Sequence, residues 1–391
     1  MTRLTEIAAR LVAADTVSSR GNAAVMGELG DRLAAAGFQV SLQRWGEGEQ
    51  AKANLVAVAG PPEPGGLVLS GHLDVVPFAD QPGWTRDPLR LTFEGDRAYG
   101  RGTSDMKVFL AQCVEAACEL DHERLRRPVV FLFTADEEIG CLGAARLVPE
   151  LDALLGAVPK PALAWIGEPT SWRVLHAHKG VAAFAVSVRG RGGHSSVPSA
   201  GVNAIAVAAR AMAVVGELQS ELRERPRPDF AALFPDAPYT TLNFGTVKGG
   251  TATNVIAEQC SFTLSYRPLP DEDPLWVHRE VERRLAERAL HDWGSEVAAE
   301  ITVSPVVVAP GLLSPTGTTL ERALRETLGV SEGGGAPFCT DGGRFAQAGI
   351  HSLICGPGDL SEAHQPDESI SRAAFEAGAE HVRRVIERLC F

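Results

Sequence analysis

Short, continuously apolar runs alternate along this chain with longer segments in which apolar and polar positions repeat with a helical period. The apolar runs cover residues 67–69, 129–133, 162–166 and 352–355 and consist mainly of Val, Leu, Ile and Phe. Runs of this length and composition are typical of strands buried on both faces. Helical periodicity is found at residues 28–36, 108–120, 143–148 and 372–389. The alternation predicts an α/β domain in which helices cover a largely parallel sheet.

The pattern changes between residues 180 and 303. Strands with strict alternation are predicted at residues 181–188, 239–247 and 257–266, together with an Ala-rich helix and a second helix at 275–290. This pattern is typical of an α+β domain, and Pro305 and Pro310 mark the return to the α/β pattern. We therefore expect an α/β domain built from residues 1–179 and 304–391, interrupted by an α+β domain at 180–303. A chain of 391 residues is long enough for two cores.

Composition narrows the function classes. The formal net charge is −12, which leaves no basic field for nucleic acid or an anionic membrane surface. The most apolar helical stretch, residues 202–215, contains Arg210 and is shorter than the roughly 20 residues of a membrane span. The first residues carry Arg3, Glu6 and Arg10 at helical spacing, unlike an export signal. The seven cysteines form no C-x-x-C pair, which favours a reducing, cytoplasmic location. From the charge and the apolar pattern we expect no nucleic-acid or membrane partner.

Candidate chemistry begins at the end of the 67–69 strand. His72 and Asp74 lie two residues apart, so on an extended segment they point the same way, one as a metal ligand and the other as its support. A buried histidine with an acidic hydrogen-bond partner is the alternative. Asp105 follows a glycine-punctuated loop and precedes the helix at 108–120, where it would either bridge two cations or cap the helix.

Acidic residues also follow the other apolar strands. Three consecutive carboxylates, Asp136, Glu137 and Glu138, come directly after the 129–133 strand, and like charges so close together need cations or solvent to compensate them. A solvated acidic turn is the alternative reading. Glu168 follows the strand at 162–166, and His364 lies in the loop after the strand at 352–355.

These side chains follow separate strands of one predicted sheet. The carboxyl ends of parallel strands form the edge at which α/β sheets bind ligands. Nitrogen and oxygen donors without a thiolate suit zinc, cobalt or manganese, and two histidines with a bridging carboxylate describe a pair of ions. We expect two Zn²⁺ ions, for which Co²⁺ or Mn²⁺ would substitute.

Five motifs in order carry a family resemblance. They are S-G-H-L-D-V-V-P at 70–77, G-R-G-T-S-D-M-K at 100–107, T-A-D-E-E at 134–138, G-E-P-T at 167–170 and A-H-Q-P-D-E at 363–368. The set resembles the di-zinc metallohydrolases that include acetylornithine deacetylase, succinyldiaminopimelate desuccinylase, carboxypeptidase G-type enzymes and aminoacylases. The resemblance spans nearly the whole chain and implies the di-zinc aminopeptidase-like fold with an inserted lid and dimerisation domain.

The resemblance also implies residue roles. Asp105 would bridge the two metals, His72 and Glu168 would complete one site, and Glu138 and His364 the other. Glu137 would be the general base for a metal-activated water, and Asp74 would hold His72 in the correct tautomer.

Three residues of the inserted domain match the family as well. In the homodimer that the resemblance implies, His194 would reach the partner subunit's site and stabilise the oxyanion. Asn254 and Arg267 would bind the substrate carboxylate, for which a guanidinium is chemically apt. A loop histidine and a surface ion pair are the alternatives for His194 and Arg267.

Two motifs indicate different substrates. The A-H-Q-P-D-E motif resembles acetylornithine deacetylases, whereas Thr340 and Arg344 lie in a T-D-G-G-R-F run similar to the S-D-G-R-F loop of desuccinylases. We expect removal of an acyl group from an N-acyl amino acid, first of all N-acetyl-ornithine in arginine biosynthesis. Desuccinylase, dipeptidase and carboxypeptidase activities stay open, as does a non-catalytic, metal-binding regulatory role.

Overall fold

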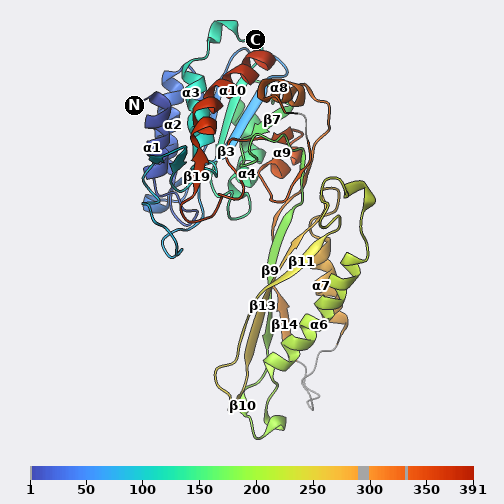
Figure 1. The fold of residues 1–391 in the computed structure, drawn as a ribbon. Helices are drawn as coiled ribbons and strands as arrows, with labels where there is room; N and C mark the ends of the chain where they lie inside the picture. The colour runs from blue at the N-terminus through green and yellow to red at the C-terminus, as the bar shows by residue number, and fades with distance from the viewer. Residues whose placement is uncertain (1, 289–298, 331–332) are drawn as a thin grey trace. The chain divides into compact units, whose positions relative to one another are not determined.

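Two compact units make up the protein in the computed structural model, which describes residues 2–288, 299–330 and 333–391 (Figure 1). The first unit contains the described residues up to Ala177, then Leu312–Ala336 and Thr340–Phe391. The second contains His178–Gly311 and Pro337–Cys339. In the part of the chain that is described, no helix is long and apolar enough to cross a membrane.

A six-stranded mixed sheet forms the centre of the first unit, in the order β1-β2-β6-β3-β7-β18. Its strands are β1 (Gln39–Trp45), β2 (Lys52–Ala59), β3 (Leu67–His72), β6 (Val129–Thr134), β7 (Leu163–Ile166) and β18 (His351–Ile354). The last four strands in this order, β6, β3, β7 and β18, are mutually parallel, whereas β2 runs antiparallel to both of its neighbours.

Helices cover both faces of this sheet. Val129, Phe131 and Phe133 of β6 pack into the larger core with the first group of helices, while Val130 and Leu132 point into the smaller core on the other face. The first group is α1 (Arg3–Ala13), α2 (Ala23–Ala35), α3 (Lys107–Cys118), α8 (Thr319–Leu328) and α10 (Arg372–Cys390). The second group is α4 (Leu142–Leu147), α5 (Leu151–Leu155) and α9 (Gly342–Gln347). Burial on both faces explains why these strands are apolar without alternation.

Two small sheets belong to the first unit, apart from His178 at the end of one strand. One is β19 (Ser369–Ser371), β5 (Arg97–Tyr99) and β4 (Thr92–Glu94), and the other is β16 (Leu312–Leu313), β8 (Ala177–His178) and β17 (Gly335–Ala336). Helix starts are capped locally, because Thr318 accepts the Glu321 amide at α8 and Ser371 accepts the Ala374 amide at α10.

The second unit is an antiparallel sheet with two helices on one face. The sheet has the order β11-β13-β9-β14, with β15 also pairing with β9. Its strands are β9 (Val181–Arg189), β11 (Thr241–Gly249), β13 (Gln259–Arg267), β14 (Glu300–Val303) and β15 (Val307–Ala309), and its helices are α6 (Ala204–Arg223) and α7 (Trp276–Glu287). Every second residue of β9 and β13 is buried against these helices. The short strands β10 (Gly193–His194) and β12 (Val255–Ile256) pair antiparallel in a separate two-stranded ribbon.

The predicted fold class, an α/β unit with an inserted α+β unit, is confirmed. The sequence reading omitted β1 and β2, and it placed the start of the second helix at residue 28, whereas α2 begins at Ala23. The return to the first unit was expected at residue 304. The chain instead stays with the second unit until Gly311, because Val307–Ala309 pairs with β9. The end of the helix expected at 275–290 lies partly outside the described residues.

Candidate metal centre

The predicted metal ligands gather at one edge of the central sheet. His72 is the last residue of β3, Glu138 and Glu168 follow β6 and β7, and His364 follows β18, which are four neighbouring parallel strands. Asp105 lies two residues before the start of α3. The strand order therefore brings together five residues that are far apart in the sequence, as expected for the carboxyl edge of an α/β sheet.

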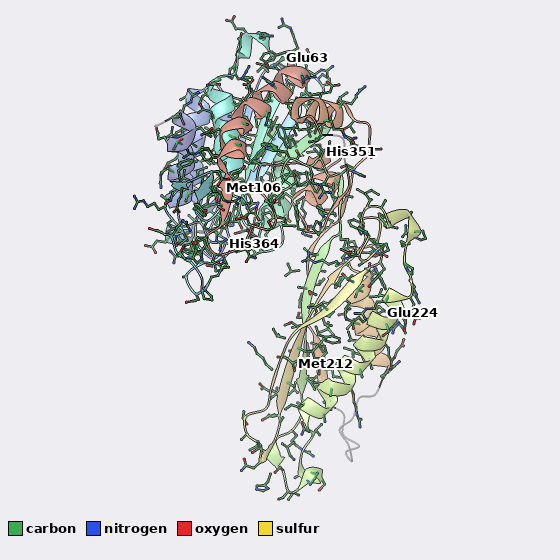
Figure 2. All side chains as sticks on the ribbon, in the orientation of Figure 1. Glu63, Met106, Met212, Glu224, His351 and His364 are labelled. Carbon is green, nitrogen blue, oxygen red and sulfur yellow. The ribbon has the colours of Figure 1, made fainter. Side chains whose placement is uncertain are left out.

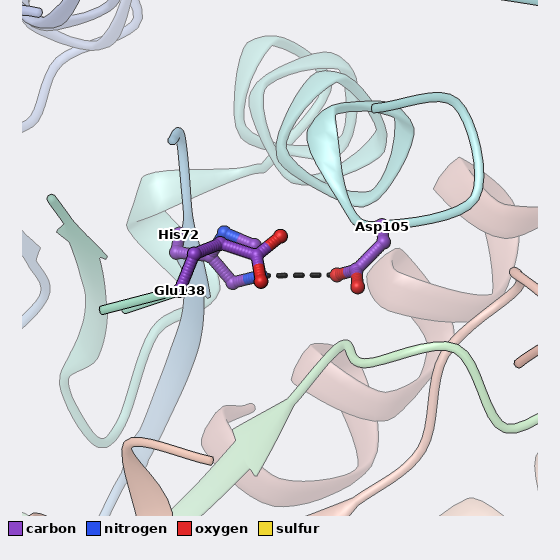
Figure 3. Close-up of side chains that lie close together, drawn as sticks. All are labelled: His72, Asp105 and Glu138. Carbon is purple, nitrogen blue, oxygen red and sulfur yellow. Dashed lines mark hydrogen bonds and ion pairs between the residues drawn. The ribbon is translucent and has the colours of Figure 1, made fainter. Parts of the chain in front are cut away.

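Asp105 lies between the two histidines. Its Oδ1 is 3.0 Å from Nε2 of His72, and its Oδ2 is 3.2 Å from Nε2 of His364. Nε2 of His364 is also 3.0 Å from Oε2 of Glu138. Figure 3 shows His72, Asp105 and Glu138 facing one another, and His364 is labelled in Figure 2. One carboxylate thus presents one oxygen to each of two imidazoles.

Two further carboxylates approach His72. Its Nε2 is 3.8 Å from Oε1 of Glu168 and 4.0 Å from Oε2 of Glu137. One group that could hold a metal ion contains His72, Asp105 and Glu138, and another contains His72, Glu137 and Glu168, with donor atoms within 4.8 Å of one another in each.

These distances suit transition-metal ligation. Zinc binds nitrogen and oxygen donors at about 2.0–2.2 Å, so two donors on one tetrahedral ion lie roughly 3.2–3.6 Å apart. The separations of 3.0 and 3.8 Å around His72 bracket this range, and those of 3.0 and 3.2 Å around His364 lie at or just below its lower end. The residues therefore fit two ions that share Asp105.

Charges in the cluster affect one another strongly. Burial opposes ionisation of Asp105, but hydrogen bonds with His364 and His72 hold its pKa below the usual range. Hydrogen bonds to Asp105 and Glu138 raise the pKa of His364 to about 10. Burial works against a charged His72, yet Asp105 and the nearby glutamates hold its pKa well above the ordinary value.

The three glutamates differ from Asp105, because their pKa values lie above the ordinary value. Burial, reinforced by Glu168, raises the pKa of Glu137 well above its ordinary value. Burial together with Asp105 does the same for Glu168, and it raises the pKa of Glu138. Negative charge in this buried space exceeds what two imidazoles can balance, so divalent cations would supply the missing compensation.

Asp74 contributes differently from the sequence expectation. The group that accepts from His72 Nδ1 is the backbone carbonyl of Asp74, at 2.9 Å, whereas the carboxylate oxygen Oδ1 is 3.7 Å away. The carboxylate instead accepts the amides of Glu137 and Glu138 at 3.1 and 3.2 Å and the Ser18 hydroxyl at 2.7 Å. The backbone thus orients His72, and the side chain holds the acidic loop.

The turn after β6 also places Glu137. Asp136 has a positive φ of 57° and an ion pair with Lys52. Cys141 has a left-handed φ of 55°, and its thiol donates to Oε1 of Glu137 at 3.4 Å. Oε2 is the oxygen that faces His72.

The sequence reading missed Cys141 and Asp341 as neighbours of Glu137. Donor atoms of the three residues lie within 4.8 Å of one another, and Asp341 accepts the Thr134 hydroxyl at 2.6 Å. No periodic pattern marks them. Asp341 lies inside the T-D-G-G-R-F motif, from which only Thr340 and Arg344 were predicted as site residues.

Thr340 and Arg344 flank that aspartate. Thr340 is buried, and its hydroxyl accepts the Gly342 amide at the start of α9. Arg344 is half-buried within α9.

His194 and Asn254 lie together in the two-stranded ribbon of the second unit. His194 pairs with Val255, and the Asn254 carbonyl accepts the Ser195 amide. The Ser196 amide, which can only donate, lies 3.2 Å from Nδ1 of the exposed His194. Nδ1 is therefore the acceptor, and in the neutral ring Nε2 carries the proton.

Arg267 lies away from these two residues within the same unit. It is exposed at the last position of β13, opposite Thr241, whereas β12 of the ribbon comes just before the first position of this nine-residue strand. At about 3.3 Å per residue the strand spans roughly 26 Å. The structure therefore does not bring Arg267 together with His194 and Asn254.

Comparison with known proteins identifies the family of this chain. The family model described as Peptidase family M20/M25/M40 matches residues 68–388. Acetylornithine deacetylase of Pasteurella multocida (strain Pm70) is 34% identical over 386 residues, which are 97% of this chain and 96% of that protein.

Solved structures show the same fold. An M20 family metallo-carboxypeptidase from Sulfolobus solfataricus superposes with a TM-score of 0.79 at 18% identity, covering 99% of both chains. A dinuclear metal-binding peptidase of the M20 family from Bacillus subtilis gives 0.63 at 17% identity, covering 98% of this chain and 97% of that one. The family resemblance is thereby confirmed, and the chain belongs to peptidase family M20/M25/M40.

Proposed function

We propose that the protein is an amidohydrolase with two metal ions that removes an acyl group from a small N-acyl amino acid. The observation that carries this proposal is Asp105, whose two oxygens point at His72 and His364. His72 with Glu168 would hold one ion, and His364 with Glu138 the other. We propose zinc, because the donors are nitrogen and oxygen at tetrahedral spacing; cobalt and manganese have similar preferences.

Glu137 is the proposed general base. When bound, the ions would acidify the attacking water and polarise the amide carbonyl. Oε2 of Glu137 faces the cluster, while Oε1 is engaged by Cys141. Oε2 is thus the atom suited to accept a proton from the attacking water and to return it to the leaving nitrogen. Burial raises the pKa of Glu137, which makes its carboxylate a stronger base than that of an exposed glutamate.

His194 is proposed to stabilise the oxyanion from the partner subunit of a homodimer formed through the second unit. The neutral tautomer that carries its proton on Nε2 leaves that donor exposed, as this role requires. Asn254, Arg267, Thr340 and Arg344 are the proposed substrate contacts. We further propose a cytoplasmic location.

N-acetyl-ornithine is the proposed first substrate, since relatives named acetylornithine deacetylase match over nearly the full length. A hydrolysis panel on zinc- and cobalt-loaded protein tests it by comparing N-acetyl-ornithine, N-succinyl-diaminopimelate, other N-acyl amino acids and dipeptides by amine release. Preference for N-acetyl-ornithine is expected. Preference for the succinyl substrate would instead assign Arg344 to a second carboxylate, and inactivity on the whole panel would contradict the proposal.

The variant Glu137→Gln tests the base. It keeps the size of the side chain but removes the proton acceptor, so kcat should fall by about 10²–10⁴-fold or more. The metal content should stay at that of the native protein, and Glu150→Gln, at an exposed glutamate, is the matched control. Near-native turnover of Glu137→Gln would refute the assignment.

A further inference from the structure

We infer that Arg101 and Glu368 are positioning residues, which fix Asp105 and the His364 loop relative to each other so that both metal sites are formed before metal binds. The inference rests on the proposed two-metal centre. Neither side chain has a role in the chemistry described above, yet each is only 1% exposed.

The carboxylate of Glu368 holds the Asp105 loop by accepting backbone amides of that loop. Its Oε1 accepts the amides of Ser104 and Asp105 at 2.9 and 3.0 Å. Its own backbone carbonyl accepts the Gly100 amide at 2.9 Å. A carboxylate that accepts two successive amides fixes the direction of the peptide, and thereby the point at which the Asp105 side chain leaves it.

Arg101 connects this carboxylate to the loop that carries His364. One guanidinium nitrogen, Nη1, donates to Oε2 of Glu368 at 2.7 Å and to the Gln365 carbonyl at 3.3 Å. The other, Nη2, donates to Oε1 of Gln81. The guanidinium also lies 5.0 Å from the centre of the Trp84 ring, which limits its orientations.

Gln81 completes the connection. Its Nε2 donates to the backbone carbonyl of His364 at 2.7 Å, while its Oε1 also accepts from the Trp84 indole at 3.2 Å. His364 needs such a restraint, because it has a left-handed φ of 62° and its side chain is 48% exposed. His72, by contrast, has a side chain that is only 1% exposed and a ring held by the Asp74 carbonyl at 2.9 Å.

The energetics favour a positioning role over a purely stabilising one. A buried ion pair recovers little more than its desolvation cost, and an apolar pair of the same volume is often as stable. What an apolar pair lacks is a fork of donors that reaches two loops at once. Through this fork, Arg101 ties the backbone of one proposed ligand loop to that of the other.

The test measures the two metal-binding steps directly, by competition of Zn²⁺ and Co²⁺ with a chromophoric chelator on the full-length protein. Arg101→Met and Glu368→Gln should weaken both steps by about 10–100-fold, since Asp105 serves both ions. Gln81→Met should weaken only the step that uses His364. Arg86→Met is the matched control. Arg86 forms its ion pair with Asp367, next to Glu368, and not with Asp105 or His364.

Each outcome decides the question. A merely structural pair would lower the melting temperature and leave both metal affinities at their native values in all three variants, which would overturn the inference. If Arg101→Met does not fold, the half-buried Gln81 still provides the decisive variant. A native protein that binds fewer than two ions would instead refute the proposed metal centre, and the inference with it.

Discussion

Substitution of Asp74 tests separately how His72 is oriented and how Glu137 is positioned. Its carboxylate accepts two successive amides and the Ser18 hydroxyl, whereas the backbone carbonyl, which no substitution removes, accepts from His72. In Asp74→Asn, either orientation of the amide turns its NH₂ toward a backbone N–H, because Oδ1 faces Glu137 and Oδ2 faces Glu138. At least one buried donor then loses its acceptor.

The magnitude follows from these bonds. An unsatisfied buried donor costs about 1–3 kcal/mol, and loss of the negative charge weakens the remaining bonds. We expect the free energy of unfolding to fall by roughly 2–4 kcal/mol, which corresponds to a melting point about 5–15 °C lower for a unit of this size.

The assay pairs thermal unfolding with metal affinity and turnover. Affinity for the ion at His72 and Glu168 should stay near native, because the tautomer of His72 is set by the Asp74 backbone. The value of kcat should fall by about tenfold or more, because a misplaced base costs rate steeply. If Asp74→Asn melts like the native protein but loses the His72 ion, the carboxylate orients His72 and our reasoning is wrong.

Three further changes test other parts of the first unit. Lys107 is fully buried, donates to the Ala14 carbonyl, and burial lowers its pKa to about 7; between pH 7 and about 10 the unfolded state alone keeps that proton, so native stability should rise with pH by up to about 1.4 kcal/mol per unit. Lys107→Met should remove this rise, and parallel slopes in denaturant titrations of both proteins would contradict it. Cys141→Gly should leave the melting point unchanged or higher, because φ is 55°, but lower kcat several-fold through the lost thiol contact with Glu137; Cys141→Ser should recover part of the rate. Gly143→Ala should cost at least about 3 kcal/mol, since a Cβ would lie 1.9 Å from the Ala135 carbonyl oxygen, and a melting point within a degree of native would refute it.

The metal-ligand edge was predictable because it depends on strand ends. Runs such as 129–133 are apolar on both faces, which identifies a central strand, and the polar residues directly after it must then lie at the carboxyl edge. The assignment of each ligand to one of the two metal ions came from the resemblance of the five motifs to the family.

Other features depend on contacts that the sequence does not display. β1 is half-buried along its length, with no strict alternation, so its pattern does not stand out as a strand. The role of the Asp74 backbone in orienting His72 is independent of side-chain type. Arg101 and Glu368 are 267 residues apart in the sequence, and only the fold buries them against each other.

The pairing of β7 with β18 has a consequence for biosynthesis. Trp165 aligns with Leu353, so the edge of β7 has no partner until the ribosome has made nearly the whole chain. At about 5–20 residues per second this interval is roughly 10–40 s. During it the second unit, which is encoded in between, can fold on its own core. His364 is completed last of the proposed ligands, so the acidic cluster is synthesised well before the second histidine that it needs.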